Sequence, residues 1–221
     1  AMWVRTIVLG AILGIIFWQK GDRVDGQLET PNDSLVDSSE NTISDDPIDS
    51  SVEKEPVVPE EYKNLLTQAK KKVNQDKYND ALVLVNQALK IYQDEQAYFV
   101  MYSAYSFLND REGKKLALRE IVETYGILES RFWIEYAGIL EELGAPLAQV
   151  EKVYTDGIQK MKSIQEFNKT HLVDMYTSYA RYLVAHARYA EAIVELRAAL
   201  LLDPARADIY NAEISHLESK L

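Results

Sequence analysis

The sequence predicts an all-α fold in which short antiparallel helices form pairs that stack side by side. The main evidence is residues 176–204, where small apolar residues stand at the places where two helix backbones would meet and larger ones surround them. Looser versions of this pattern occur earlier in the chain. The 221 residues include no cysteine, so packing rather than disulfides or thiolate metal sites must hold the fold.

Residues 1–20 are predicted to form an N-terminal transmembrane anchor. Residues 3–18 are apolar apart from Arg5 and Thr6, and tryptophans bracket them, as expected for rings at the two membrane interfaces. A helix of this length spans only about 24 Å, against a hydrocarbon core of about 30 Å, so flanking basic residues would have to snorkel. A secretory signal peptide is the alternative. Bulky residues at 17–20 stand where a small-residue cleavage site would lie, which favours an uncleaved anchor.

Gly10 and Gly14 are four residues apart within this apolar segment and would let another transmembrane helix approach closely. Two small residues in an ordinary anchor are the simpler interpretation of the pair. Basic residues lie on both sides of the segment, so its orientation rests on analogy with signal-anchor proteins. We expect a single-pass membrane protein with its N-terminus in the cytoplasm and the rest of the chain on the other side.

Residues 21–60 are predicted to be a disordered acidic linker, because they are rich in Asp, Glu, Ser, Asn and Pro and lack a sustained hydrophobic period. From Gly21 to Glu61 there are 13 acidic residues against Arg23 and Lys54, which accounts for the whole net charge of −11. Residues 61–221 are therefore nearly neutral. We expect no nucleic-acid partner, since phosphate binding requires clustered Lys and Arg.

Apolar residues at helical spacing then recur along residues 61–221. Residues 62–92 fit two helices with a turn at residues 74–76. Residues 98–125 are the weakest unit, because no single frame fits both helices; we expect a turn of non-standard length at residues 109–113 and a helix end at Gly126. Residues 130–144 repeat the first-helix pattern two 34-residue periods after the first unit, and their second helix should extend through residues 150–167. After the clearest unit, residues 206–221 are predicted to form an amphipathic capping helix.

The clearest unit resembles a tetratricopeptide repeat (TPR). The family pattern of Trp/Tyr, Leu, Gly/Ala, Tyr/Leu, Ala, Phe/Leu, Ala and Pro is matched by Tyr176, Tyr179, Ala180, Leu183, Ala192, Leu196, Ala199 and Pro204, with Tyr179 as the one departure. The resemblance implies that residues 61–221 form a right-handed α-solenoid of about four helix pairs plus the capping helix. It also implies that the first helices line a concave groove for a peptide segment or partner helix.

The groove positions of the family correspond here to Lys63, Leu66, Lys70, Arg131, Ile134, Asp174, Thr177 and Arg181. Tyr98 and Tyr102 join them as groove candidates, although with Tyr105 they form a stripe on one helix that is more often core than binding surface. One subgroup of the family clamps chaperone carboxylates with a Lys/Asn set. Leu66 and Lys70 occupy the equivalent first-repeat positions, so this clamp is absent or rebuilt.

No residue pattern favours catalysis, a cofactor or a metal. His171, His186 and His216 lack ligand spacing, Glu141 and Glu142 are expected to be solvated, and the usual phosphate-loop, nucleophile and zinc motifs are missing from the sequence. We therefore expect a non-enzymatic, membrane-tethered scaffold or adaptor for other proteins. Its organisation is similar to that of bacterial envelope assembly proteins, which favours the inner membrane with the repeats facing the periplasm. The alternatives are a permanent structural subunit of a large membrane complex and, more remotely, a secreted enzyme.

Overall fold

The computed structural model describes residues 57–164 and 169–221, and this part of the chain is all-helical. The helices are α2 (Glu60–Asn74), α3 (Tyr78–Ile91), α4 (Glu95–Leu108), α5 (Arg111–Arg119), the π-helical segment η2 (Glu120–Thr124), α6 (Ser130–Glu142), α7 (Leu147–Lys162), α8 (Lys169–Ala185), α9 (Tyr189–Leu202), the 3₁₀ segment η3 (Pro204–Arg206) and α10 (Ala207–Glu218). The prediction of an all-α fold is confirmed for these residues.

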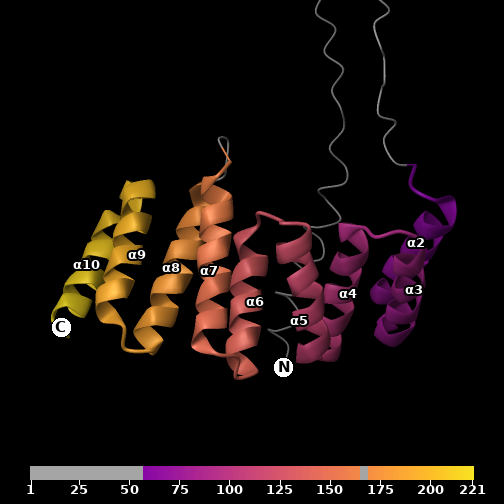
Figure 1. The fold of residues 1–221 in the computed structure, drawn as a ribbon, viewed down its shortest axis with the longest axis horizontal. Coiled ribbons are helices and arrows are strands. Elements are labelled where there is room, and N and C mark those ends of the chain that lie inside the picture. The colour runs from indigo at the N-terminus through magenta and orange to yellow at the C-terminus, as the bar shows by residue number, and fades with distance from the viewer. Residues whose placement is uncertain (1–56, 165–168) are drawn as a thin grey trace, which may run out of the picture. The chain divides into compact units, whose positions relative to one another are not determined.

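Each helix packs on the next one in the chain, and Figure 1 shows α2 to α10 following one another in chain order. Contacts also skip one helix: α2 packs on α4, and α6 packs on α8. Side chains of α4 also contact α6, through Tyr102 with Glu135 and Phe99 with Phe132, so α2, α4, α6 and α8 form one neighbouring series. This arrangement is compatible with an α-solenoid, in which each unit buries its apolar face against its neighbours.

The turns inside the four helix pairs share one backbone geometry. Each contains a single residue with positive φ: Asp76 (59°), Asn109 (54°), Gly144 (74°) and Ala187 (57°). In each, the amide of the following residue donates to the carbonyl five positions earlier: Lys77 to Lys72, Asp110 to Tyr105, Ala145 to Leu140, and Arg188 to Leu183, at 2.9–3.0 Å. This bond closes a helix C-terminus in the Schellman manner, and it places the next helix antiparallel to the first.

The turn at residues 109–113 closes with the same hydrogen bond as the other three, and α5 begins within this range at Arg111. Two residues lie between α4 and α5, against three or four in the other pairs, so the length of this link does differ. A second irregularity of this unit lies later, in η2. A π-helical turn holds more residues than an α-helical one and shifts the buried face beyond it, so a single repeat frame cannot fit. The segment then ends near Gly126, whose φ is 64°, as the sequence predicts.

The buried residues form two hydrophobic clusters. The first extends from Tyr62 to Ala117 and lies on α2 to α5. The second extends from Leu118 to Leu217 and includes the aromatic residues of α6, α7 and α8. Tyr98 and Tyr102 on α4 are half-buried and pack against both clusters. In the clearest sequence unit, Ala180, Ala192 and Ala199 are fully buried, as expected where α8 and α9 approach closely.

The N-terminal predictions fall largely outside the described residues. Within residues 57–164 and 169–221, no helix combines the length and apolar character needed to cross a bilayer. The predicted anchor with Gly10 and Gly14, and most of the acidic linker, lie outside these residues.

The second helix of the third unit, expected to extend through residues 150–167, is α7, which ends at Lys162. The predicted capping helix is α10, which packs on α9.

Candidate partner-binding surfaces

Polar side chains connect α2 to α4 at the start of the even-numbered series. The Tyr62 hydroxyl donates to Asp94 at 2.9 Å, and Asp94 also caps the N-terminus of α4 by accepting from the Gln96 amide at 3.1 Å. Lys70 donates to the Gln96 side chain at 3.4 Å. Burial lowers the pKa of Lys70, partly offset by the charge of Asp94. Lys70 is thus held in place between two helices.

A tighter polar group joins α4, α5 and α6. The Tyr102 hydroxyl donates to Glu135 Oε2 at 2.5 Å, and the Lys114 ammonium forms an ion pair with Glu135 Oε1. The Tyr102 ring meets the edge of Phe132, with centroids 5.5 Å apart. Burial, followed by the Glu135 charge, raises the pKa of Tyr102 far above its ordinary value, so the phenol stays protonated and donates.

Beside this group, α4, α5 and α6 enclose a cleft of about 280 Å³. Its lining is mainly polar and includes Asn109, Lys114 and Glu135, and Arg111 pairs with Glu142 at 3.1 Å within it. Gly138 also lines it, and a Cβ atom added at that glycine would meet no atom within 4 Å. The cleft can therefore accept a small side chain of a partner.

Ser130, His171 and Asp174 join α6 to α8. The buried Ser130 hydroxyl donates to Asp174 Oδ2 at 3.2 Å, and His171 Nδ1 lies 3.1 Å from the Ser130 hydroxyl oxygen. A hydroxyl carries one hydrogen, so when it donates to Asp174 the Nδ1–H of His171 must donate to Ser130. The serine is 3% exposed and bonded to the carboxylate rather than activated by the imidazole. This geometry positions two helices and does not make a nucleophile.

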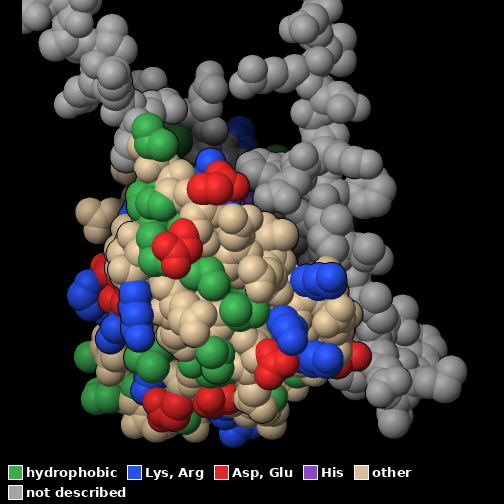
Figure 2. Space-filling model, turned by 90° about the vertical axis from the view of Figure 1, so that its right-hand side faces the viewer, with side chains coloured by type: hydrophobic (Ala, Val, Ile, Leu, Met, Phe, Trp, Pro, Cys, Tyr) green, Lys and Arg blue, Asp and Glu red, His purple; other side chains and the backbone are tan. Residues whose placement is uncertain are grey.

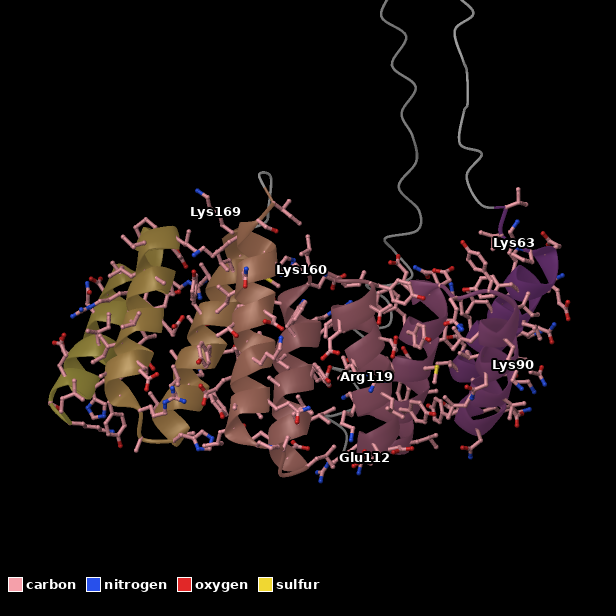
Figure 3. All side chains as sticks on the ribbon, in the orientation of Figure 1. Lys63, Lys90, Glu112, Arg119, Lys160 and Lys169 are labelled. Carbon is pink, nitrogen blue, oxygen red and sulfur yellow. The ribbon has the colours of Figure 1, made fainter. Side chains whose placement is uncertain are left out.

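The predicted groove residues lie on α2, α4, α6 and α8, but they differ in exposure. Lys63, Arg131 and Arg181 are exposed, with Lys63 3.5 Å from Glu60 and Arg131 2.7 Å from Glu129. Figure 3 shows Lys63 on α2 and Lys90 on the neighbouring α3. Ile134 and Thr177 are half-buried, and the Thr177 hydroxyl donates back to its own helix at the Val173 carbonyl, 2.9 Å away.

Leu66 and Tyr98 both pack against neighbouring parts of the fold. Leu66 is 8% exposed and belongs to the first hydrophobic cluster, so it presents little surface to a partner. Tyr98 is half-buried, its ring lies 5.7 Å from that of Tyr125, and its hydroxyl donates to Gln93 at 2.9 Å. Both residues mainly support neighbouring helices in the structure.

The odd-numbered helices carry a second set of clefts that the sequence analysis missed. One, of about 350 Å³, lies between α5 and α7 over Tyr136 and Leu140 of α6. Another, of about 390 Å³, lies between α7 and α9 over Tyr176 and Tyr179 of α8. The sequence feature that could have indicated the second cleft is in α9, where Val194 and Leu201 are apolar although they stand outside the repeat positions. In the structure they are 62% and 84% exposed.

Charge does not segregate at the end of the array formed by α2 and α3. Figure 2 shows hydrophobic, basic and acidic side chains interspersed there. Within residues 57–164 and 169–221, no three His, Asp or Glu side chains are grouped so that they could hold a metal ion. The end of the molecule formed by α2 and α3 therefore offers apolar and mixed-charge recognition.

Comparison with known proteins finds no matching family model and no matching curated protein.

Proposed function

We propose that this chain is a non-enzymatic, membrane-tethered scaffold or adaptor of the TPR type. It binds other proteins and helps to assemble or stabilise a membrane or envelope complex. The observation that carries the proposal is the series α2, α4, α6 and α8, joined at each step by side-chain contacts between neighbouring units. Repeated helices joined in this way are typical of arrays that present one long surface to an extended ligand.

The partner element proposed for this surface is a peptide segment or a helix. The exposed guanidinium groups of Arg131 on α6 and Arg181 on α8 would contact it, with the half-buried Ile134 and Thr177 between them. The cleft lined by Gly138 would accept one of its small side chains. Arginines beside apolar positions are typical of residues that dominate protein interfaces.

Photocrosslinking tests this proposal. A photoreactive residue would replace Arg131 or Arg181 in the full chain in its native host, with Gln87 and Lys90 on α3 as matched exposed controls. We expect both test positions to capture the same protein and the controls not to capture it. Capture of nothing, or of the same species at all four positions, would contradict the assignment of the even-numbered surface.

A further inference from the structure

The groove between α7 and α9 has a structural basis of its own. The helix between them, α8, packs on both neighbours and supplies the floor through Tyr176 and Tyr179. The Tyr179 ring stacks on Tyr154 of α7 with centroids 5.0 Å apart, and both tyrosines are nearly buried. The floor is therefore fixed by aromatic packing, and the groove does not depend on a mobile loop.

One wall of this groove is an apolar stripe on α9, in which Ala198 packs partly against the second hydrophobic cluster and Val194 is exposed. Val194, Ala198 and Leu201 stand at positions i, i+4 and i+7 of α9, so they share one side of that helix. The core-facing side of α9 is a different stripe, formed by Ala192, Leu196 and Ala199. Val194 is 62% exposed. Covering its side chain with another helix would remove apolar surface from water, which is favourable in free energy.

The charge within the groove indicates what would cover it. Glu195 is half-buried, and among the described residues it makes no hydrogen bond or ion pair. Burial raises the pKa of this carboxyl, because desolvation disfavours its charged form. The neighbouring carboxylates differ, since Glu151 and Glu191 both pair with Arg188. Lys162 lines the same groove and partly offsets the shift, but no ion pair joins it to Glu195.

We propose that the α7–α9 groove docks an amphipathic helix of a partner protein, with apolar side chains against Val194 and Ala198 and one basic side chain against Glu195. A half-buried carboxylate without a partner selects for a cation, because pairing restores the interactions lost on desolvation. The apolar stripe runs along the axis of α9, which suits a helix lying in the groove. This inference concerns the odd-numbered helices and goes beyond the proposed function.

Two synthetic peptides test the pairing. Both are amphipathic helices of about 14 residues, matching the length of α9, with Leu and Ala on one face; one has Arg at the centre of that face and the other has Gln. Affinity for the full 221-residue chain is measured by fluorescence anisotropy. We expect the Arg peptide to bind about tenfold more tightly than the Gln peptide. Equal affinities, or no binding of either peptide, would overturn the proposal.

Variants locate the effect. In Glu195→Gln the difference between the two peptides should disappear, whereas Glu112→Gln on α5 should leave it unchanged. Lys162→Gln should strengthen binding of the Arg peptide, since it removes a competing cation from the groove. Val194→Asp should lower the affinity of the Gln peptide. This measurement reports the apolar contact separately from the ion pair. Circular dichroism establishes that each variant is folded, and a preference for Arg that persists in Glu195→Gln would contradict the assignment.

Sedimentation and a truncated chain distinguish a partner helix from the two other molecules that could fill the groove, a second copy of the chain or residues 1–56 of the same chain. If the wild-type chain self-associates and Glu195→Gln abolishes this, the groove binds a second copy of the chain and the partner-helix proposal is wrong. If residues 1–56 of the same chain fill the groove, their removal should increase peptide affinity at least tenfold, and that outcome also overturns the proposal. A monomeric chain with unchanged peptide affinity after truncation supports the partner helix.

Discussion

Tyr102 on α4 and Glu135 on α6 are joined by a hydrogen bond of 2.5 Å, although 33 residues separate them in the sequence. Tyr62 and Asp94 make a similar connection over 32 residues between α2 and the start of α4. Phe99 and Phe132, also 33 residues apart, stack with centroids separated by 5.4 Å. These three contacts join neighbouring units at a spacing of 32 or 33 residues, whereas the contacts of Ser130 with His171 and Asp174 between α6 and α8 span 41 and 44 residues.

Removing the Tyr102 hydroxyl tests how much this connection stabilises the array. Tyr102→Phe keeps the ring on Phe132 and leaves Glu135 paired with Lys114. We expect the free energy of unfolding to fall by about 1–2 kcal/mol, because a charge-assisted hydrogen bond at a partly buried site is lost. Urea denaturation measures the change. Tyr98→Phe is the control, since its bond to Gln93 is exposed, and an equal loss in both variants would contradict the special role of Tyr102.

The shared turn geometry predicts opposite effects at two positions. Ala187 has φ of 57°, a conformation that costs a residue with a Cβ about 1 kcal/mol relative to glycine. Ala187→Gly should therefore stabilise the protein by up to about 1 kcal/mol, and Gly144→Ala, where φ is 74°, should destabilise it by about the same amount. Thermal unfolding monitored by circular dichroism measures both. Changes of the same sign would show that the two turns are not equivalent.

Glu195 should make the folded protein less stable as the pH rises from acid to neutral. The folded chain holds a proton on this carboxyl more strongly than the unfolded chain, whose glutamate pKa is about 4.3, because burial raises the folded-state pKa. The contribution of Glu195 is therefore most favourable below about pH 4.3 and is lost as the pH rises through the folded-state pKa. Glu195→Gln should be more stable than wild type at neutral pH, and this advantage should vanish in acid. Unfolding curves at pH 4 and pH 7 decide, with Glu112→Gln as the control.

The behaviour of the isolated helical region separates a transient adaptor from a permanent subunit. For an adaptor, we expect residues 60–221 to be monodisperse, because scattered exposed apolar side chains do not leave a large interface bare. For a permanent subunit of a large complex, the same fragment should aggregate or self-associate. Analytical ultracentrifugation over a range of concentrations gives the answer.

The anchor prediction is tested by the mass of the native protein. If residues 3–18 hold the chain in a membrane, the mature protein from the membrane fraction should retain the residues before Gln19. Intact-mass spectrometry measures this directly. Loss of those residues together with release into a soluble fraction would favour the secreted alternative.

The fold was predictable where local patterns and packing agree. Ala180 and Ala192 mark the close approach of α8 and α9, and Pro204 follows the end of α9 as expected. The unit around α5 was harder, because the π-helical segment Glu120–Thr124 disrupts the 3.6-residue period on which sequence patterns depend. Ala187 gave no turn signal, since alanine in a left-handed conformation is imposed by the packing of the two helices.

The candidate surfaces were predictable only in part. Arg131 and Arg181, taken from the repeat frame, lie on exposed helix surface, whereas Leu66 is 8% exposed and belongs to the first hydrophobic cluster. Glu195 could not have been found from the sequence. Its importance comes from the burial of its carboxyl between helices α7, α8 and α9, which depends on tertiary packing and has no local pattern.

The border between the two hydrophobic clusters has a consequence for cooperativity. Half-buried Tyr98 and Tyr102 reach both clusters, and α5 supplies Ala117 to the first and Leu118 to the second, so part of the coupling between the two halves passes through aromatic side chains that water can also reach. Calorimetry of the free array should then resolve two overlapping melting transitions, as quasi-one-dimensional arrays show when nearest-neighbour coupling is weak. A partner that contacts helices on both sides of the border would couple the two clusters, so the two melting transitions would merge into one. Binding would then make the whole helical region stiffer.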